Sequence, residues 1–350
     1  MSNKRLDIEL MRILACFFVI YKHTGVQGFY LFSLYDSSSL TYLMGLFLSV
    51  FCKFAVPAFF AISGALLLGR DEGIIAIWKR RALKVVLALL AWSVLYYMYL
   101  RDWSFNLSSF LKVFASGNVI YHFWYLYAYL AFIIFLPIMR RLAKALTVRE
   151  YIYLLTLYLI IYSAMPIFEC FTGVPIEENI KIPMLGCSIF IYPLLGYFLY
   201  NLPEKLWDKK KIIMLWLVNI ILMATDCALI KRDGVSTGAV GEACAQIFRC
   251  HFVIVNCACI FVTCHYFEAA LAKSARLARV ISSLGGATFG IYLMHVLFIG
   301  TDFSRTIWSL LEAANVPAYL ASFLLCVGTF LVCYIITIVL KKIPLLRRLV

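Results

Sequence analysis

Ten apolar runs, each long enough to cross a lipid bilayer, follow one another along almost the whole chain of 350 residues. A transmembrane helix needs about 20 mostly apolar residues, and a helix satisfies its own backbone hydrogen bonds inside the bilayer. The runs cover residues 10–31, 42–69, 82–100, 119–139, 150–169, 183–201, 211–230, 247–267, 282–301 and 318–340. We therefore expect an all-α, polytopic membrane protein with about ten transmembrane helices. Residues 1–350 would form one membrane domain without an extra soluble domain.

The composition excludes a soluble fold, and the positive net charge needs no nucleic-acid partner to explain it. Hydrophobic residues make up 64% of the chain and charged residues 14%, against about 45–50% and 25% in soluble domains. The net charge of +14 comes largely from Lys and Arg in segments that alternate with the apolar runs. These segments are 4–12, 70–84, 140–149, 205–211, 273–279 and 341–348. By the positive-inside rule, both termini are cytoplasmic, and segments 101–118, 170–182, 231–246 and 302–317 are outer loops.

Few sequence patterns suggest conventional soluble-enzyme chemistry. The twelve cysteines lie mostly inside apolar runs, without a CxxC pair or a Cys/His spacing typical of metal ligands. No metal site is therefore predicted. The chain contains no GxSxG, P-loop or HExxH motif. The first run lacks a small-residue cleavage site, so we expect it to remain as the first transmembrane helix.

The first run contains two ionisable residues, Arg12 and His23, which are expensive to place in a bilayer and are therefore functional candidates. Eleven residues of helix bring their side chains to within about 20° of the same face and separate them by about 16–17 Å. Arg12 would lie near the cytoplasmic interface and His23 beyond the midplane. Asp7 and Glu9 precede Arg12 closely enough to orient it. The alternative is an interfacial arginine and a histidine that satisfies a polar neighbour.

Two later runs also carry histidines. His295 lies deep in the ninth run, one turn after Tyr292, where it either contributes to a site or packs between small residues. His122 and Trp124 open the fourth run at its outer end. An aromatic cluster with a histidine suits stacking on a sugar ring, although an ordinary aromatic belt would look the same.

Basic residues of the second and third runs complete the set of candidate residues. Arg80, Arg81 and Lys84 form a basic turn at the inner end of the third run, which is suited to phosphate groups. Positive-inside bias alone would also explain them. Lys53 lies in the outer half of the second run, where it either extends to the interface or meets an anionic acceptor.

Together these segments resemble the type 3 membrane acyltransferases, which O-acylate cell-surface sugars and related molecules. Residues 5–12 (RLDIELMR) followed by His23 are similar to the first-helix signature of that family. Segments 54–64 (FAVPAFFAISG), 122–126 (HFWYL) and 289–295 (FGIYLMH) resemble its later motifs. The basic motif at 81–84 (RALK) departs from the family pattern, because lysine replaces the second arginine and lacks its bidentate fork.

The resemblance implies an acyltransferase in the cell membrane, with a bacterial plasma membrane as the expected location. The donor would be acyl-CoA, with acetyl-CoA expected, and the acceptor a glycan or a lipid-linked hydroxyl compound. Arg12, Arg80, Arg81 and Lys84 would hold the donor's phosphates. An extended donor arm of about 15–20 Å would bring the thioester to His23, acting as general base.

Other functions and assignments remain open. His295, Tyr292 or His122 would orient the acceptor, and Trp124 and Lys53 would also contact it. The chain could instead be a transporter or flippase for a small solute or lipid-linked sugar, or a scaffold for polysaccharide export. Its partners would be the lipid bilayer, acyl-CoA and the acceptor, but not nucleic acid. Oligomerisation is left open.

Overall fold

A computed structural model describes residues 5–203, 206–247 and 249–350. Every regular element within these ranges is helical. The longer helices are α1 (Leu6–Lys22), α2 (Leu40–Phe51), α3 (Ala55–Leu67), α5 (Leu83–Tyr99), α7 (Trp124–Ala145), α8 (Val148–Leu159), α11 (Ser188–Asn201), α12 (Lys209–Asp233), α14 (Val253–Ala272), α15 (Ala275–Met294), α16 (Asp302–Ala313) and α17 (Ala318–Lys342). The shorter ones are α4 (Ile74–Ile77), α6 (Leu107–Ala115), α9 (Met165–Thr172), α10 (Pro183–Gly186) and α13 (Val240–Ile247).

Eight continuous helical segments within the described ranges are long and apolar enough to cross a membrane. They are Leu40–Leu67, Ile74–Tyr99, Tyr121–Ala145, Val148–Thr172, Lys209–Asp233, Val253–Ala272, Ala275–Leu297 and Ala318–Lys342. Each coincides with one of the predicted runs, which confirms the all-α, polytopic prediction. The remaining two runs correspond to α1, with 17 residues, and α11, with 14. The number of ten spans and the cytoplasmic location of both ends remain predictions.

Three segments expected to be loops contain helices instead. The segments 101–118, 231–246 and 302–317 hold α6, most of α13 and α16. These helices have 9, 8 and 12 residues, which is too short to cross a bilayer. Hydropathy over a spanning-length window identifies only long apolar runs, so short helices with polar faces are not distinguished from loops.

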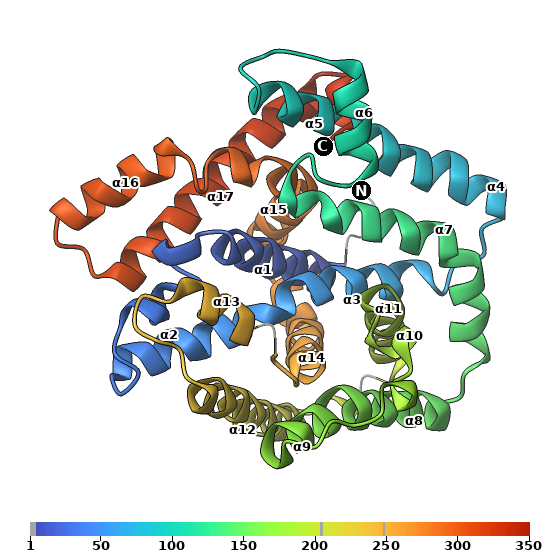
Figure 1. Cartoon of the computed structure of the whole chain (residues 1–350). Coiled ribbons are helices and arrows are strands. Elements are labelled where there is room, and N and C mark those ends of the chain that lie inside the picture. Colours follow the sequence, from blue (N-terminus) through green and yellow to red (C-terminus); the bar gives the residue numbers. More distant parts are fainter. Residues whose placement is uncertain (1–4, 204–205, 248) are drawn as a thin grey trace.

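Helix α1 lies at the centre of the bundle (Figure 1) and contacts α3, α14, α15 and α17. Its buried apolar residues include Met11, Ala15 and Val19, which recur at helical spacing. Polar side chains on α1 are therefore surrounded by protein. This central position explains how ionisable side chains on α1 can avoid contact with lipid.

Two glycines allow α3 and α11 to pack with their backbones in contact. A Cβ atom added at Gly64 would lie 1.9 Å from the Pro193 carbonyl oxygen, and one at Gly196 would lie 1.9 Å from the Ala61 oxygen. No real Cβ tolerates that distance, so a larger residue would force the helices apart. Close packing through small residues is the usual way that membrane helices associate.

The helices that carry the two deep histidines both end at those residues. Helix α1 stops at Lys22, and His23 is its C-terminal capping residue. Helix α15 stops at Met294, and the short 3₁₀-helix η9 (His295–Leu297) follows. Because α1 and α15 are neighbours in the bundle, the fold brings the ends of both helices, and both histidines, together.

Candidate active site

The rings of His23 and His295 are in direct contact. Their Nδ1 and Nε2 atoms, respectively, are 2.7 Å apart, and the ring centroids are 4.9 Å apart. His295 is completely buried, whereas His23 keeps part of its surface accessible. On the other side of His295, its Nδ1 lies 2.6 Å from the Tyr292 carbonyl oxygen. The three groups form a continuous hydrogen-bonded chain.

When both rings are neutral, the hydrogen-bond partners determine which ring nitrogens carry a proton. The Tyr292 carbonyl can only accept, so His295 Nδ1 carries a proton and donates it. His295 Nε2 is then an acceptor, and His23 Nδ1–H donates to it. His23 Nε2 is left with a lone pair. This nitrogen is the one that can take a proton from another molecule.

Aromatic side chains enclose the histidine pair. The His122 ring lies 5.2 Å from that of His295 and 6.3 Å from that of His23. His122 is buried, and neither of its ring nitrogens makes a hydrogen bond of normal geometry with a described residue. The Tyr121 ring lies 5.2 Å from His23 and is 57% exposed. His122 therefore packs behind the pair, whereas Tyr121 forms its accessible side.

A cavity of about 430 Å³ leads toward the histidines from the opposite end of α1. Along α15 its wall extends from Gly285 to Tyr292, a rise of about 10 Å. Near Gly285 the wall is basic, and near Tyr292 it is aromatic. The basic residues are Arg12, Arg80, Arg81, Lys84 and Lys341; the tyrosines are Tyr125, Tyr129 and Tyr292. The lining ends at Tyr292, one helical turn before His295.

An acidic side chain orients Arg12 at the basic end. Arg12 Nη1 donates to Glu9 Oε1 at 2.9 Å, and Glu9 is buried. The prediction that Asp7 also orients Arg12 is wrong. Five residues of helix turn Asp7 away from Arg12, and its carboxylate instead bonds Arg5 at 3.1 Å and His265 at 2.8 Å.

Asp7 belongs to a group that the sequence did not reveal. Its carboxylate, His265 and Glu268 offer potential metal-ligand atoms within 4.8 Å of one another. Arg5 donates to both carboxylates, at 3.1 Å to Asp7 and 3.0 Å to Glu268. The arginine supplies the positive charge that a metal ion would bring, so the group is an ion-pair network that joins the start of α1 to α14.

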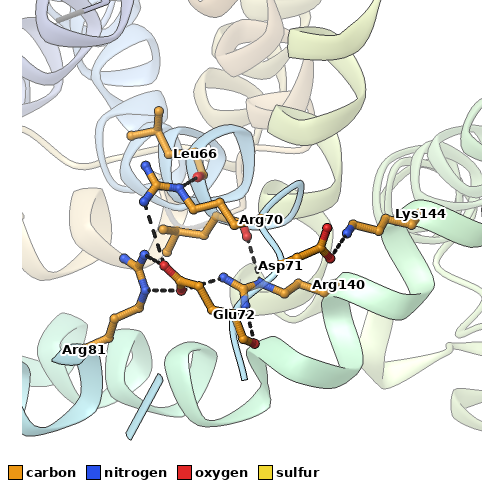
Figure 2. A network of polar contacts seen from close by, with 8 residues as sticks. Leu66, Arg70, Asp71, Glu72, Arg81, Arg140 and Lys144 are labelled. Atoms are coloured by element: carbon orange, nitrogen blue, oxygen red, sulfur yellow. Dashed lines mark hydrogen bonds and ion pairs between the residues drawn. The ribbon is translucent and has the colours of Figure 1, made fainter. Parts of the chain in front are cut away.

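A second carboxylate, Glu72, organises the basic wall of the cavity (Figure 2). Arg81 donates to both Glu72 oxygens, from Nε at 2.9 Å and Nη2 at 2.6 Å. Arg140 approaches from α7, donates to Glu72 at 3.0 Å and caps α3 by donating to the Leu67 carbonyl at 2.9 Å. The bond to Arg81, followed by that to Arg140, lowers the pKa of the Glu72 carboxyl to about 2. Glu72 thus fixes the orientation of Arg81 beside the cavity.

The other two candidate acceptor residues are Trp124 and Lys53. Trp124 is 51% exposed and contacts Tyr125 edge-to-face, with no ring contact to His23 or His295 among the described residues. Lys53 lies within electrostatic reach of Asp226 and Lys22. The sequence pattern drew attention to this end of the fourth span, but it did not show that Tyr121 contacts His23.

Comparison with known proteins identifies the family of the chain. A family model described as an acyltransferase domain, of the acyltransferase 3 type, matches residues 5–338. The chain therefore belongs to the acyltransferase 3 family and is a multi-pass membrane acyltransferase. No curated protein and no solved structure matches it significantly.

The low pKa of Glu72 makes its stabilising effect dependent on pH. The contribution is complete above the ordinary carboxyl range and disappears as pH falls toward about 2. Glu72→Gln should therefore lower the unfolding free energy by about 1–3 kcal/mol at neutral pH, and the difference from wild type should shrink as the pH is lowered from about 5 to 3. Thermal unfolding of the detergent-solubilised protein, followed by tryptophan fluorescence, measures this.

Glu312→Gln is the matched control, because Glu312 is exposed and forms no ion pair with a described residue. It should unfold like wild type at each pH. A Glu72→Gln deficit that stays constant with pH would contradict the assigned charge.

Proposed function

We propose that the protein transfers an acyl group, with acetyl expected, from acyl-CoA to a hydroxyl of a surface glycan or related acceptor. The observation that carries the proposal is the His23–His295 hydrogen bond beyond the aromatic end of a cavity whose other end is basic. Positive charge suits the phosphates of the donor, and a neutral imidazole suits removal of a hydroxyl proton. Membership of the acyltransferase family supports both.

The donor would enter the basic end, which the positive-inside rule places in the cytoplasm. Arg12, Arg80, Arg81 and Lys84 would bind its phosphates, and its extended arm would follow α15 toward Tyr292. The separation of about 16–17 Å between Arg12 and His23 along the helix is close to the length of that arm. Because the cavity ends at Tyr292, a shift of the Tyr125 or Tyr292 ring would open the last part of the path.

His23 would act as the general base. Its Nε2 takes the proton of the acceptor hydroxyl while the hydroxyl oxygen attacks the thioester carbonyl carbon. The tetrahedral intermediate then expels the CoA thiolate, which takes the proton from His23. The products are the O-acyl ester and free CoA thiol, and His23 returns to its starting form.

His295 would be a positioning residue for this step. By accepting from His23 Nδ1 it directs the lone pair of Nε2 toward the accessible side of the ring. Its own Nδ1 is fixed by the Tyr292 carbonyl, so the orientation passes from the backbone of α15 to His23. Tyr121, the exposed ring beside His23, would support the acceptor as it approaches.

Replacing His23 by Ala should remove the base. We expect kcat to fall by about 10²–10⁴-fold, which is the usual contribution of a general base. Purified protein in nanodiscs, supplied with acetyl-CoA and cell-envelope glycan, would be assayed for release of CoA thiol and for glycan-bound acetyl. His251→Ala is the control, because the His251 ring lies outside the histidine cluster. Wild-type activity in His23→Ala would contradict the mechanism, and solute uptake without thioester loss in wild type would favour a transporter.

The positioning role of His295 predicts a graded effect. His295→Ala should lower kcat with little change in the KM for acetyl-CoA, since the donor's phosphates bind elsewhere. His295→Gln should recover part of kcat, because its amide oxygen can still accept from His23 Nδ1–H. If Gln were no better than Ala while both variants stayed folded, His295 would serve packing alone.

Arg12→Ala tests the donor end separately. Loss of a charge-assisted hydrogen bond to phosphate should raise the KM for acetyl-CoA by about tenfold or more, with a smaller effect on kcat. Arg12→Lys should be intermediate, since lysine keeps the charge but not the planar fork. Arg276→Ala, at an exposed position at the start of α15, is the control. An unchanged donor affinity in Arg12→Ala would contradict the phosphate role.

A further inference from the structure

A second cavity lies beside the basic end of the first and has a volume of about 560 Å³. We call it the basic pocket. Its lining residues are Lys79, Leu83, Lys84, Leu87, Lys341, Arg347 and Arg348. Five of the seven are cations and none is acidic. Lys84 and Lys341 also line the larger cavity, so the two spaces are adjacent.

The positive charge in this pocket converges from three parts of the chain. Lys79, in the π-helical turn η4 (Trp78–Ala82), and Lys84, in α5, form the first part. Lys341 lies at the end of α17 and is the second. Arg347 and Arg348 lie in the turn η10 (Leu346–Arg348) and are the third. Positive-inside bias explains basic residues at the end of each span. It does not explain why the chain after α17 turns back toward α5.

That return is fixed by specific contacts. The Trp92 indole N–H on α5 donates to the Leu349 carbonyl at 3.1 Å. Val350 is buried and lines the larger cavity. The segment that carries Arg347 and Arg348 is therefore held against α5, and the two arginines are held at the wall of the pocket.

Four cations of the basic pocket differ from three arginines at this end of the bundle. Arg12, Arg81 and Arg140 are each paired with a glutamate. By contrast, no ion pair between described residues involves the cations Lys79, Lys84, Arg347 and Arg348. Lys341 donates to the Gly286 carbonyl. Such a concentration of like charge, with no carboxylate in its wall, favours a bound anion.

We infer that the basic pocket binds a phosphate group carried by a larger molecule. Guanidinium and ammonium groups together are typical phosphate ligands, and the volume lies within the usual range of about 300–1,000 Å³ for ligand sites. The phosphate has two sources: the nucleotide end of the donor, reaching across from the neighbouring cavity, or the headgroup of an anionic lipid. Leu83 and Leu87, which are both exposed, provide an apolar surface for lipid chains.

Binding of the donor's nucleotide end rests on the proposed function, whereas binding of an anionic lipid does not. The family match ends at residue 338, so Lys341, Arg347 and Arg348 lie outside the part of the chain that the family describes. The pocket therefore combines residues inside the matched range with residues that follow it.

The test compares the double variant Arg347→Gln/Arg348→Gln with wild type. Arg276→Gln/Arg279→Gln is the matched control, because these arginines are also three or fewer residues apart, exposed, and on the face predicted to be cytoplasmic. One arm measures binding of adenosine 3′,5′-bisphosphate to protein in neutral, lipid-free detergent by calorimetry. The other counts phosphatidylglycerol adducts by native mass spectrometry, with phosphatidylcholine as the uncharged comparison.

We expect the double variant to lose affinity for at least one probe by about tenfold or more, while the control variant binds like wild type. Loss for the nucleotide assigns the pocket to the donor, and loss for phosphatidylglycerol assigns it to lipid. Lys79→Gln, a milder change in the same wall, should weaken the same probe if the double variant does not fold.

Equal binding of both probes to wild type and to the pocket variants would overturn the inference, as would a wild type that binds neither. Failure of the proposed function looks different. In that case wild type would not cleave acetyl-CoA, yet selective phosphatidylglycerol binding through the arginines would stand. Conversely, the double variant could turn over acetyl-CoA with an unchanged KM and bind lipid as wild type does. That result would support the proposed function and contradict phosphate binding in the basic pocket.

Discussion

The structure depends on one constraint, which is that an ionisable side chain inside a bilayer needs a partner within the protein. Helix α1 carries such side chains along its length, and it lies at the centre of the bundle, where partners are available. Arg12 bonds Glu9, and His23 bonds His295. The His23–His295 pair requires α15 to run beside α1 and to end at the same level. The position of the candidate site therefore follows from how the polar groups of α1 are satisfied.

The sequence predicted eight of the spans correctly, and it singled out two histidines that the structure brings into contact, because both depend on local signals. A run of about 20 apolar residues is visible without any knowledge of the fold, and eight runs coincide with helices of spanning length. His23 and His295 stand out because an ionisable residue in such a run is rare. The family resemblance joined them as parts of one pattern, which geometry alone could not do for residues 272 positions apart.

The remainder of the site depends on contacts that leave no local trace. Glu72 lies in a short polar connection, and nothing in its neighbours indicates that it binds Arg81 and Arg140. Around residue 122 the sequence shows several rings in succession, but only the fold decides that His122 is buried and Tyr121 is exposed. Residues after α17 look like an ordinary basic end, and the hydrogen bond from Trp92 to Leu349 is what brings them back to the bundle.

The two ends of α1 differ in the way in which they use charge. Near Arg12 the guanidinium groups are held by carboxylates, which fixes their orientation but leaves them with less uncompensated charge for a ligand. In the adjacent basic pocket, Lys79, Lys84, Arg347 and Arg348 form no ion pair with a described residue. An anion that bridges the two spaces would thus find oriented hydrogen-bond donors in one and net charge in the other. At the His23 end, a neutral, hydrogen-bonded histidine pair leaves one ring nitrogen with a lone pair that can accept a proton. The length of α1 thus separates the oriented guanidinium group of Arg12 from the histidine pair, and the cavity along α15 extends from the first toward the second.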